Sequence, residues 1–172
     1  MPETMTSGQE KEAALIRLMD QYGGMLLNLC AVTLRDAAWA QDAVQETFIK
    51  AYRAMEQLNS VGSERAWLIR IAMNTCRDYL RTGWFRHIDR RTPVDQLPEI
   101  AAPETRDGEI LAEVQRLPLR ERQVILLHYW QNMSAEEIGA ALNIDRATVY
   151  RRLDRARKKL KLMLTGEGGG DA

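Results

Sequence analysis

One stretch of this chain has a pattern that indicates a mechanism as well as a fold: residues 133–164, MSAEEIGAALNIDRATVYRRLDRARKKLKLML. Ser134 stands three positions before Glu137, the spacing of a capping box, in which side chains and backbone donors at a helix start satisfy each other. A helix is therefore predicted to begin at about Ser134. Residues 143–145 break its apolar periodicity and offer Asp145 as the cap of a second helix. Two helices joined by so short a turn are typical of a helix-turn-helix.

The predicted second helix is amphipathic and strongly basic. Its apolar stripe is Val149, Leu153 and Ala156, which Leu160 continues. The other faces carry Tyr150, Arg151, Arg152, Arg155, Arg157, Lys158, Lys159 and Lys161. In a helix-turn-helix this helix enters the major groove, where arginine binds guanine through two hydrogen bonds or neutralises phosphate. The alternative is a solvated helix whose cations complement the negative end of the helix dipole. The capped first helix and the tight turn favour DNA binding.

Charge is distributed unevenly along the 172 residues. The chain has no net charge and is 45% apolar, which allows one ordinary domain or two small ones. Basic residues outnumber acidic ones over residues 116–161, whereas residues 89–113 are mainly acidic. The basic surface is therefore concentrated, as nucleic-acid binding requires.

Several functional classes lack their signatures. Cys30 and Cys76 have no cysteine or histidine at metal-ligand spacing, so we expect buried free thiols, and His87 and His128 are equally isolated. We find no phosphate-cradling glycine loop and no nucleophile paired with a base, and we expect neither an enzyme nor a cofactor or metal site. No apolar run reaches the length of a membrane span, and the start lacks the blocks of a signal peptide. We therefore expect a cytoplasmic protein.

The N-terminal part predicts two amphipathic helices. The first covers residues 11–34, and the pair Gly23-Gly24 is expected to kink it or split it in two. The second covers residues 37–58, and its outer face carries Gln41, Asp42, Gln45, Glu46, Lys50 and Arg53. A mixed polar face of this kind is either solvated or binds a partner, and the residues alone fit both interpretations.

A third helix is predicted over residues 64–82, capped by Ser63 and preceded by a loop of turn-forming residues at 59–63. It carries a basic series, and aromatic residues are interleaved with it. These residues are Arg65, Arg70, Asn74, Arg77 and Arg81, with Trp67, Tyr79, Trp84 and Phe85. Such a pattern suits an unstacked single strand, because aromatics stack on bases while cations follow the backbone. Plain core packing is the alternative, and we favour it for Trp67.

Helical periodicity on both sides of a proline-containing stretch, with no strand alternation, predicts an all-α protein of two small helical domains joined by a flexible linker. Three prolines and scattered acids mark the linker, and Pro118 suits the first turn of a helix over residues 119–130. We predict a first domain at 8–84, a linker at 85–106, a second domain at 107–165 and a disordered tail at 166–172.

Three stretches together resemble one protein family. They are DAVQETFIKAYRAM from Asp42, ERAWLIRIAMNTCRDYLR from Glu64 and LPLRERQVILLHYWQNMSAEEIGAALNIDRATVYRRLDRARKKL from Leu117. Their order and spacing resemble the bacterial RNA polymerase sigma factors of the small extracytoplasmic-function (ECF) class of the sigma-70 family. A helix-turn-helix alone would fit many regulators, whereas the first two stretches would not. The resemblance implies a sigma region 2 helical bundle followed by a sigma region 4 helix-turn-helix.

The resemblance also implies roles for individual residues of the first domain. The helix at 42–55 would dock on core RNA polymerase through Asp42, Gln45, Glu46 and Lys50. The loop after it would capture a flipped base of the minus-ten element, with Leu58, Asn59, Ser60, Val61, Gly62 and Ser63. The opened strand would meet Arg70, Asn74 and Arg77.

The second domain would read the minus-thirty-five element as duplex. Tyr150, Arg151, Asp154 and Arg155 would lie nearest the bases, and Arg146, Thr148, Arg152 and Arg157 would mostly hold phosphate. Asp154 would either accept from a cytosine amino group or orient a neighbouring arginine. The implied protein is a transcription initiation factor with no small-molecule substrate. Its implied partners are core polymerase, promoter DNA and an anti-sigma protein, often membrane-anchored.

Two other classes fit part of the pattern. A helix-turn-helix repressor or activator would bind a palindrome as a dimer without polymerase. A helical adaptor would use its basic helix to bind an acidic partner, and its DNA affinity would lack a steep salt dependence.

Overall fold

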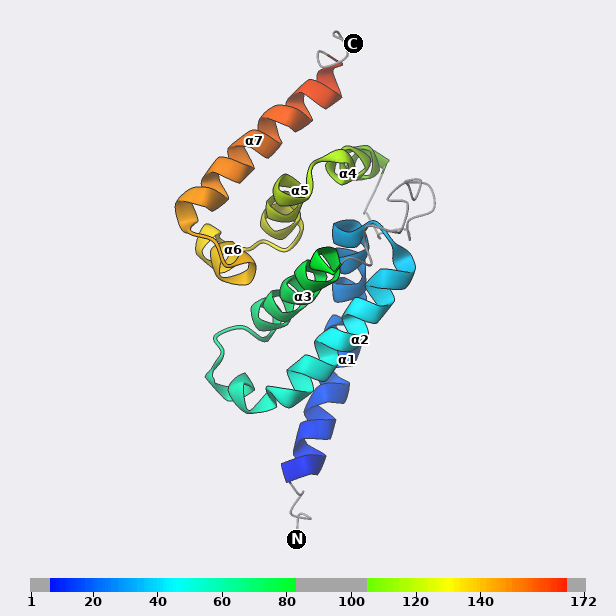
Figure 1. Cartoon of the computed structure of the whole chain (residues 1–172), viewed down its shortest axis with the longest axis vertical. Coiled ribbons are helices and arrows are strands. Elements are labelled where there is room, and N and C mark those ends of the chain that lie inside the picture. Colours follow the sequence, from blue (N-terminus) through cyan, green and yellow to red (C-terminus); the bar gives the residue numbers. More distant parts are fainter. Residues whose placement is uncertain (1–6, 83–104, 167–172) are drawn as a thin grey trace. The chain divides into compact units, whose positions relative to one another are not determined.

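A computed structural model of the chain describes residues 7–82 and 105–166, with the side chains of 105–109 excepted (Figure 1). The chain divides into two compact units, Met1–Ile88 and Asp89–Ala172. All regular elements of the described residues are helical, which confirms the prediction of an all-α protein with two helical domains. Of the predicted linker, residues 85–104 lie outside the described part, as do residues 167–172 of the predicted tail. Residues 105 and 106 belong to helix α4.

The first unit is built from α1 (Ser7–Leu34), α2 (Ala37–Arg53) and α3 (Glu64–Arg81), which contact one another pairwise (Figure 1). Each helix contributes one apolar stripe to a common core. The fully buried side chains include Leu18, Leu26 and Val32 of α1 with Leu68, Ile69 and Met73 of α3, and the smaller Ala40, Ala43 and Ala51 of α2. The small residues of α2 let the other two helices approach it closely.

Two predicted boundaries of this unit were wrong. Helix α1 is continuous through Gly23-Gly24, so the predicted split does not occur, since the apolar residues on both sides are held by the same core, and the predicted kink stays a prediction. The second helix ends at Arg53 instead of residue 58, and a 3₁₀ helix, η1 (Met55–Ser60), follows it. The predicted loop at 59–63 is therefore shortened to residues 61–63. Met55, the first residue of η1, remains buried along this path.

Capping was predicted correctly at the start of α3. The hydroxyl of Ser63 accepts a hydrogen bond from the backbone N–H of Ala66 at 3.2 Å. The buried free thiols are also confirmed. Cys30 and Cys76 face each other across α1 and α3, with their sulfur atoms 3.6 Å apart and without a disulfide.

The second unit contains α4 (Thr105–Arg116), α5 (Leu119–Ile125), a π-helical turn η4 (Leu126–Trp130), α6 (Ala135–Leu142) and α7 (Arg146–Thr165). The single helix predicted at 119–130 therefore changes its hydrogen bonding after Ile125. The N–H of Gln131 donates to the carbonyl of Leu126, five residues earlier, at 3.2 Å. This widened turn leads the chain out of the helix and toward Ser134.

Helices α6 and α7 form the predicted helix-turn-helix. The Ser134 hydroxyl accepts from the N–H of Glu137 at 3.1 Å, and the Glu137 carboxylate accepts from the N–H of Ser134 at 3.4 Å. Asp145 caps α7 by accepting from the N–H of Thr148 at 2.7 Å. Val149, Leu153 and Ala156 are buried, as their spacing predicted.

The turn between these helices requires a glycine. The carbonyl of Gly139 accepts from the N–H of Ile144 at 3.0 Å, and a Cβ atom at position 139 would lie only 2.7 Å from the Ile144 carbonyl oxygen. Asn143 makes the turn with a φ of 56°, in the left-handed region. The absence of a side chain at 139 thus sets how closely α6 approaches the start of α7.

We predict that Gly139→Ala destabilises the second unit by roughly 1–3 kcal/mol, because the new methyl group clashes with a backbone atom that cannot move alone. The measurement is amide hydrogen exchange resolved to α6 and α7. Gly24→Ala is the matched control, since a Cβ there meets no atom within 4 Å. This control should stabilise α1 by roughly 0.5–1 kcal/mol, and amide exchange in α1 should slow accordingly. Slower exchange in α6 for Gly139→Ala would contradict the steric argument.

Candidate nucleic-acid interface

The exposed face of α7 carries the predicted DNA-reading residues. Packing of α7 on α5 and α6 turns its apolar stripe inward, and this leaves its cations in solvent. The exposed members of the predicted set are Arg146, Tyr150, Arg151, Asp154, Arg155 and Arg157. Thr148 and Arg152 are half-buried. Burial and the nearby charge of Arg120 lower the pKa of Arg152, although an arginine remains protonated at neutral pH.

Several of these side chains are ordered by contacts within the unit. The Arg146 guanidinium lies 5.5 Å from the ring centre of Tyr150 and donates to its hydroxyl at 3.3 Å. Arg151 donates to the Thr148 hydroxyl at 2.9 Å. The Asp154 carboxylate lies 3.0 Å from the Lys158 ammonium. Asp154 therefore pairs with a lysine one turn further along α7, and its predicted contact with a cytosine or an arginine stays a prediction.

Other basic residues hold the unit together. Lys159 donates to the buried Glu121 at 2.9 Å, which ties α7 to α5. The guanidinium of Arg122 is buried and donates to the carbonyls of Gln115 and Leu117, each at 3.2 Å, where α4 ends. These cations are therefore committed to the fold, and the basic run in the sequence overstates the surface offered to phosphate.

Arg157 has a partner that the sequence did not suggest. Its Nε–H donates to the hydroxyl of Tyr129 at 2.8 Å, and its guanidinium lies 5.6 Å from the centre of that ring. Tyr129 belongs to the π-helical turn η4, far from α7 in sequence. A phosphate contact by Arg157 would have to share or replace this hydrogen bond.

In the first unit a pocket of about 300 Å³ opens between the end of α2, η1 and α3. It is lined by Lys50, Ala54, Gln57, Trp67, Arg70, Ile71 and Asn74. Arg70 and Asn74 were predicted to meet an opened strand, and the structure brings them together. Gln57 and Ile71 were missed, although the spacing of residues 67, 70, 71 and 74 already marks one face of α3. Trp67 is buried, which confirms the favoured core interpretation, and it also borders this pocket.

Lys50 belongs to this pocket and not to the face that carries Gln45. Its ammonium donates to the Thr75 hydroxyl at 3.1 Å and lies 3.4 Å from Glu46 and 3.6 Å from Asp78. The polar face predicted on α2 is thus divided between two sides of the helix. Glu46 and Lys50 face α3, whereas Gln45 faces α1.

Tyr79 reinforces the α3 side of α2. Burial, the charge of Glu46 and a hydrogen bond with Glu46 raise the pKa of Tyr79 to about 12, and the charge of Asp42 contributes. The Tyr79 ring also packs edge-to-face on Trp39, with 5.2 Å between ring centres. Tyr79 is therefore a structural residue of the α2–α3 contact.

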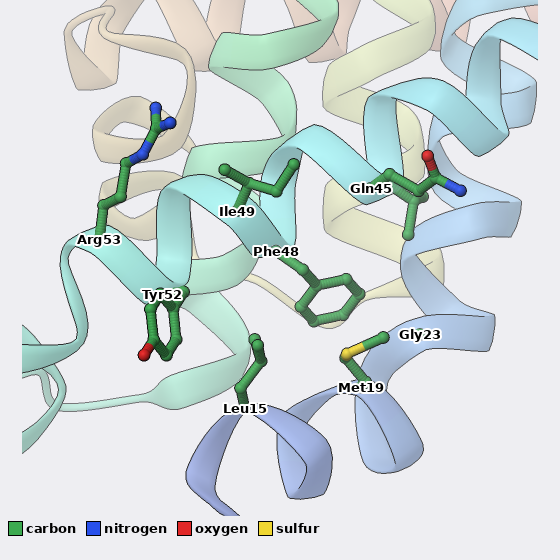
Figure 2. A pocket seen from close by; sticks show the side chains of 9 residues that line it. Leu15, Met19, Gly23, Gln45, Phe48, Ile49, Tyr52 and Arg53 are labelled. Atoms are coloured by element: carbon green, nitrogen blue, oxygen red, sulfur yellow. The ribbon is translucent and has the colours of Figure 1, made fainter. Parts of the chain in front are cut away.

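The α1 side of α2 forms an apolar groove of about 690 Å³ (Figure 2). It is lined by Leu15, Met19 and Gly23 of α1 and by Val44, Gln45, Phe48, Ile49, Tyr52 and Arg53 of α2. Met19 is 47% exposed and Ile49 is 52% exposed. In Figure 2, Gln45 and Arg53 stand at the edge of the groove and the apolar side chains lie between them. Met19, Ile49 and the 39% exposed Tyr52 therefore bring large apolar side chains to the surface at one place.

The second unit has an apolar groove of its own, of about 920 Å³. Residues of α4, α5, η4 and α7 line it, among them Val114, Trp130, Leu160 and Leu164. Leu164 is 52% exposed.

The described residues hold no cluster of three potential metal ligands among histidine, cysteine and acidic side chains. A search of their helices for a stretch long and apolar enough to cross a bilayer also finds none.

Comparison with known proteins places both units in one family. The model of sigma-70 region 2 matches residues 18–86, and that of sigma-70 region 4 matches residues 107–160. The chain is similar to the ECF RNA polymerase sigma factor SigL of Mycobacterium tuberculosis, with 32% identity over 89% of this chain and 90% of that one. It is also similar to the RNA polymerase sigma-E factor of Streptomyces coelicolor, with 33% identity over 73% of this chain and 72% of that one.

Solved structures share the fold. CnrH, solved in complex with the cytosolic domain of CnrY, superposes with a TM-score of 0.64 and 26% identity over 90% of each chain. The sigma factor RpoE of Bartonella quintana, solved with the anti-sigma factor NepR, gives a TM-score of 0.67 at 21% identity. That comparison covers 87% of this chain and 95% of that one.

The Glu121–Lys159 pair predicts a pH dependence of stability. Burial raises the pKa of Glu121, but hydrogen bonds with Lys159 and with the backbone, together with the charges of Lys159 and Arg155, outweigh burial and leave the pKa below its ordinary value. The unfolded chain has a glutamate pKa of about 4.3. The stabilisation is therefore present above that pH and is lost as pH falls through the lower folded pKa.

We expect the second unit to lose stability steeply below about pH 4, and Glu121→Gln to flatten this dependence. Urea unfolding followed by hydrogen exchange in α5 and α7 is the measurement. Glu136 is an exposed acid on α6, so Glu136→Gln should leave the loss of stability at low pH, the acid limb of the pH profile, unchanged. An unchanged acid limb in Glu121→Gln would show that other groups govern it.

Proposed function

The chain belongs to the ECF class of the sigma-70 family of RNA polymerase sigma factors, so it directs RNA polymerase to promoters, and we propose how its surfaces divide that work. The first unit binds core polymerase and the minus-ten element, and the second binds the minus-thirty-five element. The observation that carries the proposal is the presence of both sigma regions in order, each with a surface suited to its task. No step requires a catalytic group.

The apolar groove between α1 and α2 is the proposed docking surface for core polymerase. The family resemblance assigns the interface to the helix at 42–55, and the groove occupies the exposed α1 side of that helix. Gln45 borders the groove and supplies hydrogen bonds at its rim, as interfaces with an apolar centre and a polar edge require. Lys50 is held by Thr75 and Asp78, and we assign it to the pocket between η1 and α3 instead of the polymerase contact.

The pocket between η1 and α3 is the proposed receptor for a flipped base of the minus-ten element. Flipping costs a few kcal/mol of stacking, which a stacking or hydrogen-bonding pocket must recover. Asn74 and Gln57 each offer an amide donor and acceptor to a base edge, and Arg70 adds a cation for the strand. Residues 58–63 lie in sequence between Gln57 and Trp67, which both line this pocket, and this position supports the proposal that the segment helps to capture the flipped base.

Helix α7 is the proposed reader of the minus-thirty-five element. Its exposed arginines suit both guanine edges and phosphate. Arg151 and Arg155 lie on this face, with Tyr150 and Asp154 between them in sequence. Because Thr148 already orders Arg151, less conformational entropy is lost when that guanidinium meets a base.

An anti-sigma protein is the proposed regulator, and a membrane anchor on that partner is a further part of the proposal. The support is the family resemblance, together with the capture of the similar protein CnrH in complex with the cytosolic domain of CnrY. The two apolar grooves are surfaces that such a partner would need to cover. A bound partner would then exclude polymerase by occupying the same surface.

Reconstitution with core polymerase tests this function. The purified chain is expected to produce promoter-specific transcripts that core polymerase alone does not make. Ile49→Asp places a charge in the groove between α1 and α2 and should weaken core binding on the order of tenfold or more. Ile16→Asp is the matched control, because Ile16 is 55% exposed on α1 and does not line the groove. Failure of the unmodified chain to bind core polymerase would overturn the proposal.

Substitutions in the two units should block different steps on the same promoter. Arg151→Ala and Arg155→Ala are expected to weaken duplex binding upstream on the order of tenfold each, through lost base or phosphate contacts. Asn74→Ala should leave that binding intact and reduce strand opening, measured by permanganate reactivity of unpaired thymines. Identical defects in both steps for all three variants would refute the assignment.

A further inference from the structure

The segment that flanks the proposed base pocket is tied to α1 at both of its ends. At its start, the Lys11 ammonium lies 3.1 Å from the Glu56 carboxylate. At its end, the Arg17 guanidinium donates two hydrogen bonds to the carboxylate of Glu64, at 2.7 and 2.9 Å. The Tyr22 hydroxyl adds a longer contact to the same carboxylate, at 3.4 Å. Helix α1 therefore brackets residues 56–64 with two ion pairs.

The Arg17–Glu64 pair is the stronger of the two constraints. A bidentate arginine–carboxylate pair fixes orientation as well as distance, and its members are 48% and 32% exposed. The hydrogen bond from Arg17 lowers the pKa of Glu64, so the carboxylate is charged at neutral pH. Glu64 is also the first residue of α3, where a negative charge favours the helix dipole.

Apolar packing leaves this segment weakly held. Within η1 only Met55 is buried, and the remaining side chains up to Ser63 are half-buried or exposed. The middle of α3, by contrast, is anchored by Leu68, Ile69 and Ala72, all fully buried. The ion pairs therefore act where the core does not reach, at the junction of the segment with α3.

We propose that Arg17 is a positioning residue for strand capture. Through Glu64 it sets where the segment joins α3, and so it shapes the pocket that Gln57 and Asn74 border. The inference rests on the proposed function, because it assigns a task within the capture of the minus-ten strand. The more exposed Lys11–Glu56 pair assists at the other end of the segment.

The test uses the chain reconstituted with core polymerase on a promoter that the unmodified protein transcribes. Footprinting of the upstream duplex measures closed complexes, and permanganate reactivity measures open ones. Arg17→Gln and Glu64→Gln should each lower the ratio of open to closed complexes by about twofold to fivefold. The double variant should be no worse than either single one, because the pair is lost only once. Arg17→Lys should give a ratio between those of the unmodified chain and Arg17→Gln, since lysine keeps the charge but cannot make both parallel hydrogen bonds to the carboxylate.

The ratio separates positioning from mere stability. Loss of folded protein lowers open and closed complexes together and leaves their ratio unchanged. Glu12→Gln, an exposed acid on α1, is the control and should leave the ratio unaltered. An unchanged ratio in Arg17→Gln, or additive effects in the double variant, would overturn the inference. Absence of promoter-specific transcripts from the unmodified chain would instead overturn the proposed function.

Discussion

The close approach of α6 to the turn before α7 governs what the second unit can do. Gly139 lets the backbone at Ile144 pass within reach of a hydrogen bond, and this contact sets the angle at which α7 leaves the turn. Once that angle is set, Val149 and Leu153 enter the core and Arg151, which lies between them in sequence, is turned outward. The DNA-reading face is thus a consequence of a steric constraint on the opposite side of the motif.

Cations in this protein serve two different purposes that their charge alone does not distinguish. Lys159 and Arg122 satisfy a buried carboxylate and buried carbonyls, and they stabilise the second unit. Arg151 and Arg155 remain on the exposed face of α7. Some basic residues are needed for such contacts, because a buried polar group without a hydrogen-bond partner destabilises the folded state.

In the first unit α2 lies between two surfaces with different chemistry. Its α1 side is an apolar groove open to solvent, and its α3 side is a network of Glu46, Lys50 and Asp78 beside the pocket proposed to receive a base. A single rigid helix therefore links the proposed polymerase contact to the proposed strand contact.

Features that depend on residues close in sequence could be predicted from the sequence alone. Capping at Ser63, Ser134 and Asp145 and the buried stripe of α7 follow from local hydrogen bonding and from helical period, and the family follows from three ordered stretches. The DNA contacts assigned to the exposed side chains of α7 stay a prediction. Three features depend on tertiary packing: α2 ends at Arg53, a π turn follows α5, and Gln45 and Lys50 lie on different sides of α2, toward α1 and α3. These outcomes depend on contacts between helices distant in sequence, which determine the side of a helix that remains open to solvent.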